Sequence, residues 1–590
     1  MCGILAAFSS STFSQNDANK ALLIMSNRGP DNKDEWRDKG VYMGHLRLSI
    51  LDLDVRSSQP MHSLCERFVI IFNGEIYNYL ELRNDLISKG IKFRTFSDTE
   101  VILELFKLDK ELMLNKLHGM FAFVIWDKQT KTAFAARDPY GIKPLYYSNF
   151  KDGLIISSQL KSISAIEIIN KEFDYDSEAK FWILGSIPEP NTFYKNIKLL
   201  ESGNYIWIHN NKIIEQVCWK NIGEIWQNAA NPYIAIPRHK VQSIVKKAIN
   251  ESISRHIVSD VPIGVFLSGG IDSGTLVGLL TDAKVKDITG ITIAYKEFEN
   301  TKQDEVPVAK EIANFYGIKH HIRYITKAEF FSDLPKILIS MDQPSIDGIN
   351  TWFASKAASE LGIKVVLSGV GGDELFMGYN TFKQIPPIVK FFNLFNNILL
   401  FRKFSNLFFK TYSKLSKNSR WNDANLFLSN ISHAWLLKRS SNSINDLPIL
   451  MNQNFNKINF NSDKLLHSIT GKRSNNPHLE LAQLESMSYL RNQLLRDSDW
   501  ASMAHSVELR TPFVDFTLLD NLKDVLIFFK DFRNKVLLAN STSKPLPKSI
   551  ANRKKTGFSI PVIDWISKTS EYSGSWQKIV LQKYNESLNE

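Results

Sequence analysis

The sequence predicts two α/β domains in series, and three observations lead to this fold class. A chain of 590 residues is too long to be organised around one hydrophobic core. The first 205 or so residues are rich in apolar strands and contain two clear helices. From residue 241 onward, helices alternate with short apolar strands, which is typical of a parallel sheet covered by helices.

The N-terminal region contains elements whose boundaries the sequence indicates. Helices are recognised by apolar spacing, by acidic residues in a first turn, or by a glycine after the last turn. A polar turn between two apolar runs indicates a hairpin. We expect a buried strand at 68–72 that ends at Asn73-Gly74, an amphipathic helix at 79–89, a helix from Asp98 to about 107, and a hairpin of 121–126 with 132–136.

The C-terminal region changes character in its middle. The expected apolar strands are 261–267, 288–294 and 364–367. Residues 381–475 interrupt this pattern and are rich in Phe, Leu, Asn and Lys, which fits either the core helices of an all-helical insert or a membrane-surface patch. We place the domains at 1–215 and 240–590, with residues 206–240 as a transition.

Composition excludes several classes of protein. Lys and Arg number 72 against 61 Asp and Glu, a net charge of +11 with a pI near 9.1. The excess is dispersed, so we expect no nucleic-acid partner, although an anionic substrate or membrane surface would suit it. Cys2, Cys65 and Cys218 have no disulfide or zinc-site spacing. Without a secretory leader or a transmembrane segment, the expected location is cytoplasmic.

Cys2 follows only the initiator methionine. Removal of Met1 would leave a residue that carries both a thiol and a free α-amine. Such a residue can act as a nucleophile with its own amine as general base, and the amine pKa of about 7.7–8.0 suits that task. Cys2 is therefore a candidate N-terminal nucleophile, although an early cysteine is by itself a weak signal.

A glycine-rich turn after the strand at 261–267 is a candidate phosphate site. The turn reads Ser268-Gly269-Gly270-Ile271-Asp272-Ser273 and leads into a helix. Glycines allow close backbone approach, N–H groups at the helix start bind an anion, and the serines add donors. Asp272 could hold magnesium beside the phosphates. A plain strand–helix turn would explain the glycines but not the serines and the aspartate.

A second turn of the same kind runs from Ser368 through Gly369 to Asp373. It again follows an apolar strand and leads into an acidic helix start. Two such turns at the strand ends of one parallel sheet would face each other across a crevice. Asp373 is therefore a candidate second carboxylate for magnesium.

These motifs together resemble the glutamine-hydrolysing asparagine synthetase family. SGGIDS is similar to the PP-loop of ATP pyrophosphatases, and the resemblance covers nearly the whole chain. The other motifs that carry it are Arg28 to Asp31, His45 to Ser49, Asn73 to Asn78, Arg137 to Leu145, Ser368 to Tyr379, Val507 to Phe513 and Lys555 to Phe558. It implies a class II glutamine amidotransferase domain, an Ntn-hydrolase-like αββα sandwich, followed by an adenine nucleotide α hydrolase-like (PP-loop) domain with helical additions.

The resemblance implies a role for each residue of a glutaminase site. Cys2 would attack the glutamine side-chain amide, and Asn73-Gly74 would form the oxyanion hole from a side-chain amide and a backbone N–H. Arg47 would bind the glutamine α-carboxylate with its planar guanidinium. Asp98 and the Glu75 backbone would hold the α-amine.

The resemblance likewise implies ATP and Mg²⁺ as cofactors of the second domain. The residues expected at ATP are Phe266, Ser268, Gly269, Gly270, Asp272, Ser273, Ile293, Ser368 and Gly369, with Phe266 and Ile293 lining the adenine pocket. Asp272 and Asp373 would hold Mg²⁺. Lys555 is similar to a family lysine that reaches the phosphates during adenylation.

The sequence departs from the family around the expected acceptor. Val370 replaces a typical acidic residue, and residues 342–344 and 347–351 also differ, so we expect these changes to cluster at the acceptor pocket. The implied reaction converts aspartate to asparagine, with ammonia passing between the sites internally. Amidation of a sugar uronate in surface-polysaccharide synthesis and a catalytically silent scaffold are the alternatives, and the sequence leaves room for a homodimer.

Overall fold

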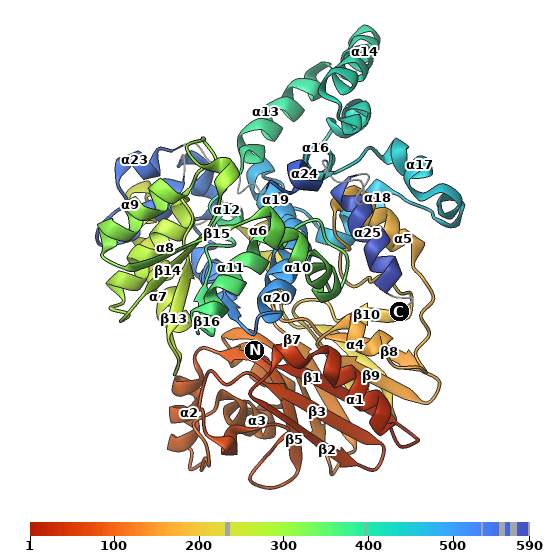
Figure 1. Ribbon diagram of the computed structural model, residues 1–590, viewed down its shortest axis with the longest axis vertical. Helices are drawn as coiled ribbons and strands as arrows, with labels where there is room; N and C mark the ends of the chain where they lie inside the picture. The colour runs from red at the N-terminus through yellow and green to blue at the C-terminus, as the bar shows by residue number, and fades with distance from the viewer. Residues whose placement is uncertain (230–235, 396–397, 533–534, 554–560, 567–574, 588–590) are drawn as a thin grey trace.

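The structure is a computed structural model, and it describes residues 1–590 apart from 230–235, 396–397, 533–534, 554–560, 567–574 and 588–590. Two antiparallel sheets form the N-terminal half and lie at the bottom of Figure 1. A parallel sheet and most of the helices lie above them. The expected two-domain α/β fold class is therefore confirmed.

Two six-stranded sheets form the N-terminal domain. The first has the order β10-β8-β9-β1-β3-β2, with β1 Gly3–Ser9, β2 Asn32–Asp38, β3 Val41–Arg47, β8 Tyr146–Phe150, β9 Gly153–Ser157 and β10 Ile197–Leu199. The second has the order β12-β11-β7-β6-β5-β4, with β4 Met61–His62, β5 Phe68–Ile76, β6 Gly119–Asp127, β7 Thr132–Arg137, β11 Asn204–His209 and β12 Lys212–Cys218.

The alternation of side chains along these strands produces four layers. In β1, Ile4, Ala6 and Phe8 join the cluster between the sheets, whereas Leu5 and Ala7 join a cluster with α1 (Gln15–Ile24) and α4 (Leu160–Ser164). On the outer face of the other sheet, α2 (Tyr79–Ser88) and α3 (Asp98–Asp109) cover β5 and β6. This arrangement is the expected αββα sandwich.

Two local expectations for this domain were wrong. Residues 206–218, expected to be transitional, lie in the β11–β12 hairpin that extends the second sheet. The strand expected to end at Asn73-Gly74 continues to Ile76, because both residues pair in register with β6. A Cβ at Gly74 would stand 2.1 Å from the Met120 carbonyl oxygen, so glycine permits this close pairing despite its turn preference.

The C-terminal domain contains a five-stranded parallel sheet of order β15-β14-β13-β16-β17. Its strands are β13 Ile263–Phe266, β14 Thr289–Tyr295, β15 Lys319–Ile325, β16 Val365–Leu367 and β17 Glu508–Arg510. The chain winds outward from β13 to β15 and then returns to the other side of β13 at β16. The ends of β13 and β16 therefore define a topological switch point, where α/β sheets bind ligands.

The remaining helices lie above the N-terminal sheets; among them, α5 (Tyr175–Leu184) comes from the N-terminal domain and packs against helices of the C-terminal domain. Along the chain they are α5 Tyr175–Leu184, α6 Ile222–Asn228, α7 Val241–His256, α8 Ile271–Asp282, α9 Val306–Tyr316, α10 Lys327–Ser340, α11 Ile349–Glu360, α12 Gly372–Leu375, α13 Asn380–Phe395, α14 Leu399–Ser416, α15 Ala424–Phe427, α16 Ile431–Arg439, α17 Leu447–Met451 and α18 Ser462–Thr470. They continue with α19 Pro477–Leu484, a π-helix at Glu485–Leu495, α20 Arg496–Met503, α21 Phe516–Leu522, α22 Val536–Ala539, α23 Lys548–Ala551, α24 Val562–Ile566 and α25 Trp576–Ser587. The pair α13 and α14 projects from the body (Figure 1). Among the described residues, no helix has the length and apolar character needed to cross a bilayer.

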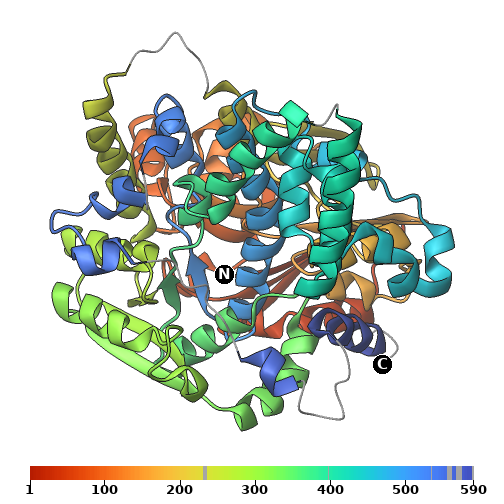
Figure 2. The ribbon, with the colours of Figure 1, turned by 90° about the horizontal axis from the view of Figure 1, so that it is seen from above.

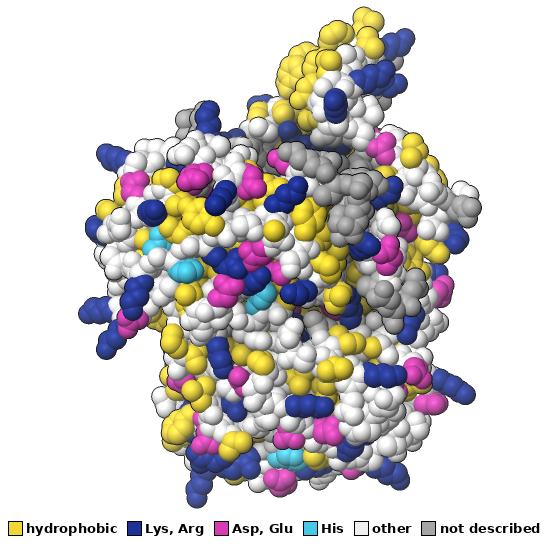
Figure 3. All heavy atoms as spheres, in the orientation of Figure 1, with side chains coloured by type: hydrophobic (Ala, Val, Ile, Leu, Met, Phe, Trp, Pro, Cys, Tyr) yellow, Lys and Arg dark blue, Asp and Glu magenta, His cyan; other side chains and the backbone are white. Residues whose placement is uncertain are grey.

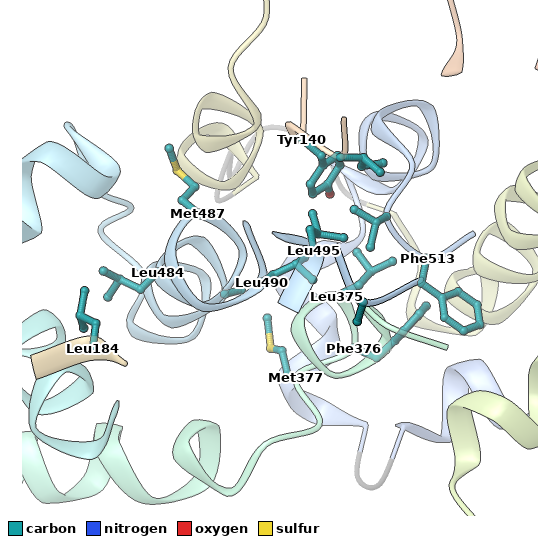
Figure 4. Packing of buried hydrophobic residues seen from close by; sticks show 14 of the residues in the cluster. Tyr140, Leu184, Leu375, Phe376, Met377, Leu484, Met487, Leu490, Leu495 and Phe513 are labelled. Atoms are coloured by element: carbon teal, nitrogen blue, oxygen red, sulfur yellow. The ribbon is translucent and has the colours of Figure 1, made fainter. Parts of the chain in front are cut away.

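The two domains share one hydrophobic cluster. Tyr140 of the N-terminal domain belongs to the same cluster as Leu490 and Leu495 of the π-helix, and Figure 4 shows the three side chains close together. The N-terminus lies at the junction of the domains in Figure 1 and near the centre of the view in Figure 2. Met1 is accordingly only 2% exposed, so the start of the chain is buried between the domains.

Candidate active sites

Cys2 and Asn73 are joined by a buried hydrogen bond. The Cys2 backbone N–H donates to Asn73 Oδ1 over 3.0 Å. Asn73 is fully buried, and none of the described groups accepts a hydrogen bond from its Nδ2. A buried amide donor without a partner is costly unless a ligand supplies an acceptor. Asn73 therefore has the properties of an oxyanion donor held beside Cys2.

The electrostatic surroundings of Cys2 are mixed. Burial raises the pKa of the thiol, while the chain's amino terminus, the Leu48 N–H and the Arg47 charge act to lower it. Arg28 adds a second anchor, because its Nε donates to the Cys2 carbonyl oxygen over 3.2 Å. The same guanidinium pairs with Asp499 of α20 through two hydrogen bonds of 2.7 and 3.0 Å. Cys2 is thus held by both domains.

The residues expected to hold glutamine lie around this pair. Arg47 is buried, and its Nη1 donates to the Asp54 carbonyl oxygen over 3.0 Å. Asp98 begins α3 and accepts the Ile76 N–H over 3.0 Å. Burial raises the Asp98 pKa to about 6, although two backbone N–H groups oppose the shift. A carboxylate with that pKa is largely ionised at neutral pH and can receive an ammonium group.

The Glu75 side chain belongs to a network across the domain boundary. Glu75 Oε1 lies 3.6 Å from Arg510 Nη2, and Arg510 Nε pairs with Glu508 Oε1 at 2.6 Å. The amino group of Met1 lies 3.3 Å from Glu508. Burial raises the Glu75 pKa well above its ordinary value, and the charge of Glu508 adds to that shift. Strand β17 of the C-terminal sheet thereby reaches the start of the chain.

The two glycine-rich turns of the C-terminal domain are in contact. A Cβ at Gly369 would stand 2.8 Å from Asp272 Cβ and 3.1 Å from the Ser273 nitrogen. Only a glycine allows the second turn to approach the first this closely. Ser268 and Ser273 share a hydrogen bond of 3.0 Å between their hydroxyls, and Ser268 Oγ accepts the Gly270 N–H. Both serines therefore hold the shape of the loop.

Lys535 bridges the two carboxylates expected to bind magnesium. Its Nζ lies 2.5 Å from Asp272 and 2.6 Å from Asp373, and the side chain is 7% exposed. Burial opposes its charge, but the two carboxylates raise the Lys535 pKa above its ordinary value. The carboxylates thus converge on one point. Because Mg²⁺ commonly takes one or two carboxylates together with substrate phosphates, this pair fits such an ion. Within the described ranges, no group of three or more His, Cys, Asp or Glu residues forms a metal site.

The other residues predicted to contact ATP lie on the strands beside the glycine turns, at the start of the second turn, or outside the described residues. Phe266 ends β13 and is partly buried, and Ile293 lies on the neighbouring strand β14 with 5% exposure. Ser368 is buried at the start of the second turn, where its N–H donates to the Arg510 carbonyl oxygen. Lys555 lies outside the described residues.

The sequence departures do not all lie at one pocket. Asp342 accepts the N–H groups of Leu160 and Lys161 over 2.9 and 3.0 Å, so it caps α4 of the N-terminal domain. Gln343 Nε2 lies 3.3 Å from the Tyr146 hydroxyl of the same domain. The expectation that these residues cluster at the acceptor pocket was therefore wrong, and they serve the domain junction.

A cavity of about 410 Å³ lies beside the other departures. Its lining includes Asp347, Ile349 and Asn350 from the varied stretch, together with Trp435, Lys438, Arg439, Tyr489, Gln493 and Trp576. Arg439 links this cavity to the second turn. Its guanidinium carbon lies 3.8 Å from the Tyr489 ring centre and 4.6 Å from that of Tyr379, whose hydroxyl donates to Glu374.

Comparison with known proteins places the chain in a family. Residues 1–219 match the model of the glutamine amidotransferase domain, and residues 245–585 match that of asparagine synthase. The chain is 31% identical to asparagine synthetase [glutamine-hydrolyzing] 1 of Bacillus subtilis over 606 aligned positions, which cover 99% of this chain and 90% of the relative. The chain belongs to the glutamine-hydrolysing asparagine synthetase family. It is therefore a glutamine-dependent amidotransferase that uses ATP.

Two further similarities extend the comparison. A putative asparagine synthetase of Methanocaldococcus jannaschii is 33% identical over 406 positions, covering 65% of this chain and 76% of that protein. Among solved structures, a glutamine phosphoribosylpyrophosphate amidotransferase from B. subtilis is 16% identical with a TM-score of 0.29, covering 64% of this chain and 77% of that chain.

Sequence reasoning assigned no role to Arg28, Asp499, Glu508, Arg510 or Lys535. Arg28 and Arg510 each lie in a motif that the sequence analysis recognised, but the motif did not indicate what either side chain does. Asp499 and Lys535 gave no such signal, because their partners lie hundreds of residues away. Burial of these charges becomes visible only in the folded structure, between the domains for Arg28 and Asp499 and within the C-terminal domain for Lys535.

Proposed function

We propose that this family member is a ligase that converts a carboxylate to an amide, with AMP and pyrophosphate as co-products. One observation carries the proposal: a single hydrophobic cluster contains Met1, the neighbour of Cys2, and also Leu375 and Phe376, which follow the second glycine turn. A site that releases ammonia and a site that activates a carboxylate are thereby joined through a dry interior.

The glutaminase half-reaction follows from the first site. After removal of Met1, the Cys2 thiol loses its proton to its own amine and attacks the glutamine amide carbon. The developing oxyanion receives hydrogen bonds from Asn73 Nδ2 and the Gly74 N–H, which need no reorganisation at that moment. Arg47 binds the α-carboxylate, and Asp98 with the Glu75 backbone binds the α-amine. Collapse of the tetrahedral intermediate expels ammonia, which takes the proton held by the amine, and leaves a thioester. Water then hydrolyses the thioester, which releases glutamate and the free thiol.

The activating half-reaction belongs to the second site. ATP would lie across Ser268 to Ser273 and Ser368-Gly369, with Phe266 and Ile293 lining the pocket for its base. Asp272 and Asp373 would hold Mg²⁺, which when bound neutralises phosphate charge. Before the nucleotide arrives, the positive charge of Lys535 offsets the repulsion between these two carboxylates. Lys555 would reach the phosphates as the acyl-adenylate forms. A carboxylate is a poor electrophile until its oxygen becomes a good leaving group.

Ammonia would travel between the sites through the shared cluster. Ammonia that entered bulk water at neutral pH would be protonated and would lose its nucleophilic lone pair. Met120, Tyr140, Leu490 and Leu495 all belong to this cluster, and Figure 4 shows the last three near Leu375, which follows the second turn. An apolar route favours the neutral molecule over ammonium, because burying an unpaired charge is costly.

Aspartate, which would give asparagine, is the acceptor that family membership favours. A sugar uronate is the second candidate, and the large cavity supports it. Cavities of roughly 300–1,000 Å³ suit drug-sized ligands. The 410 Å³ cavity offers two indole rings, Trp435 and Trp576, with Lys438 as a cation for a carboxylate, while Arg439 is already paired with Glu485 at 2.6 Å. Val370 also lacks the carboxylate expected to assist attack on a small amino-acid acceptor.

The deciding experiment offers the purified enzyme aspartate and a set of sugar uronates, each with ATP, Mg²⁺ and glutamine. Pyrophosphate release and the mass of the amide product are measured. Turnover of aspartate at a rate equal to or above that of every uronate supports asparagine synthesis, and the reverse ranking supports uronate amidation. No pyrophosphate with any carboxylate, and no glutaminase activity, would support the silent scaffold.

A further inference from the structure

The α13–α14 hairpin, made of α13 (Asn380–Phe395) and α14 (Leu399–Ser416), carries an apolar face that the rest of the described chain leaves uncovered. On α14 the side chains of Leu400, Phe404, Leu407, Phe408 and Leu415 are 54–79% exposed. Their spacing of 4, 3, 1 and 7 residues places them on one side of the helix. Single exposed apolar residues are ordinary, whereas a continuous exposed stripe indicates an interaction surface.

The opposite face of α14 already has its packing partners. Ser405 and Ser413 are 6% exposed, and the Phe409 ring stacks on Trp421 with centres 6.0 Å apart. The outward stripe is therefore not a core face that the fold failed to use. The helix has 18 residues, so it is about 27 Å long, and the hairpin holds it away from the body of the protein (Figure 1).

Helix α13 adds to the same apolar surface at the tip of the hairpin. Phe391, Leu394 and Phe395 are 37–69% exposed and follow a helical spacing of 3 and 1. Aromatic contacts hold the two helices together there, with the Phe395 and Phe401 ring centres 5.6 Å apart. The projecting tip consequently presents two aromatic-rich helices side by side.

The charge of this segment is entirely of one sign. Residues 375–422 contain eight Lys and Arg residues and no Asp or Glu. Lys403, Lys410 and Lys414 are exposed and lie along one flank of the α14 stripe, again at helical spacing. In Figure 3 the hydrophobic side chains gather on one side and the end of the projection, with Lys and Arg side chains on the other side. An apolar stripe flanked by lysines is typical of helices that lie in a membrane interface.

We propose that the α13–α14 hairpin binds the surface of an anionic lipid bilayer. The apolar stripe would enter the boundary between headgroups and acyl chains, and the lysine stems would extend toward the lipid phosphates. A second copy of the chain fits this surface poorly, because a two-fold contact would oppose one lysine flank to another without any acidic partner in the segment. The enzyme would then act as a peripheral protein that works on an acceptor near a membrane.

The test is flotation of the purified full-length protein with two kinds of vesicle, phosphatidylcholine alone and phosphatidylcholine with phosphatidylglycerol at three to one. We expect binding to the anionic vesicles that weakens in 0.5 M salt and is at least tenfold lower on neutral vesicles. The triple variant K403E/K410E/K414E and the double variant F404S/F408S should each lose at least tenfold in partition coefficient.

Two control variants match these changes elsewhere on the surface. K92E/K151E/K302E reverses three exposed lysines, and L23S/L112S removes two exposed leucines. Both should float like the unaltered protein, and all variants should keep glutaminase activity, which shows that they are folded. Equal binding to neutral and anionic vesicles, no flotation, or full binding by F404S/F408S would overturn the proposal. A concentration-dependent dimer of the unaltered protein that F404S/F408S does not form would overturn the proposal in favour of self-association.

Discussion

The two candidate sites differ in how complete they are before any ligand binds. At Cys2 the geometry is already made by hydrogen bonds with Asn73 and Arg28 and by the buried Arg28–Asp499 ion pair, which joins the two domains. At the facing glycine turns, the two carboxylates are instead occupied by the ammonium of Lys535. The comparison teaches that the first site is assembled before a substrate binds, while the carboxylates of the second are paired with a charge that nucleotide and metal must displace or share.

The largest expected effect separates the two sites completely. Cys2→Ala should lower glutamine-dependent amide synthesis by at least about 10³-fold, because no other described thiol lies at Asn73. Ammonia-dependent synthesis should stay within about twofold, because the second site is untouched. Product formation with each nitrogen source measures both. Cys65→Ala, at an exposed thiol, is the matched control, and equal loss with both nitrogen sources would contradict the assignment.

Asp272→Asn tests the second site in the same way. Synthesis should fall by about 10²- to 10³-fold with glutamine and with ammonia alike, since a carboxylate for the metal and one of the two partners of Lys535 are lost. Glutamine hydrolysis measured alone should persist. Asp287→Asn removes an exposed carboxylate that pairs only with Lys319 in the described structure and should change neither activity. A loss confined to glutamine hydrolysis would contradict the assignment of Asp272 to the ATP site.

Arg28 and Asp499 test whether the Cys2 site depends on the C-terminal domain. Asp499→Asn leaves the Arg28 guanidinium buried without its charge partner, which should cost about 3–5 kcal/mol in the free energy of unfolding. The glutaminase kcat should also fall, because Arg28 holds the Cys2 carbonyl. Thermal denaturation and glutaminase kinetics give the two readouts. If the double variant Arg28→Met/Asp499→Asn is no more stable than Asp499→Asn alone, the unpaired Arg28 charge is not the cause of the lost stability.

The smallest predicted effect is a pH dependence at Asp98. Because burial raises its pKa to about 6, the carboxylate loses its charge as the pH falls through 6. Glutaminase kcat/KM should then decrease about tenfold for each further unit of pH, while Asp98→Asn should be low at all pH values. A raised carboxyl pKa also means that this group's contribution lowers the unfolding free energy as the pH rises from about 4 to 6. A flat kcat/KM between pH 5 and 7 would exclude Asp98 from glutamine binding.

Local sequence signals predicted the parts of the molecule that depend on neighbouring residues. The strand at 261–267 followed by SGGIDS, and the hairpin of 121–126 with 132–136, appear in the structure with small shifts of boundary. Such elements are determined by apolar periodicity and turn residues within a few positions. The sequence also predicted that the two glycine turns face each other, because turns at the ends of parallel strands in one sheet lie at the same edge.

Contacts between distant segments were not predictable in this way. Arg28 and Asp499 are 471 residues apart, and neither has a local pattern that indicates its partner. Strand β17 is three residues long and too short for periodicity to detect. Asp342 was expected at the acceptor pocket because residues 342–344 depart from the family pattern, whereas in the structure it accepts a backbone hydrogen bond from α4. Each error concerns a residue whose role is set by which domain it faces.

The central claim is that ammonia released at Cys2 reaches the second site without leaving the protein. It is tested by supplying ¹⁵N-amide glutamine together with an excess of unlabelled ammonium and measuring the isotope in the product amide by mass spectrometry. The account predicts that most of the product carries ¹⁵N even when free ammonium exceeds the glutamine nitrogen. A label that matches the bulk mixture of the two nitrogen sources would show that ammonia equilibrates with solvent and would contradict it.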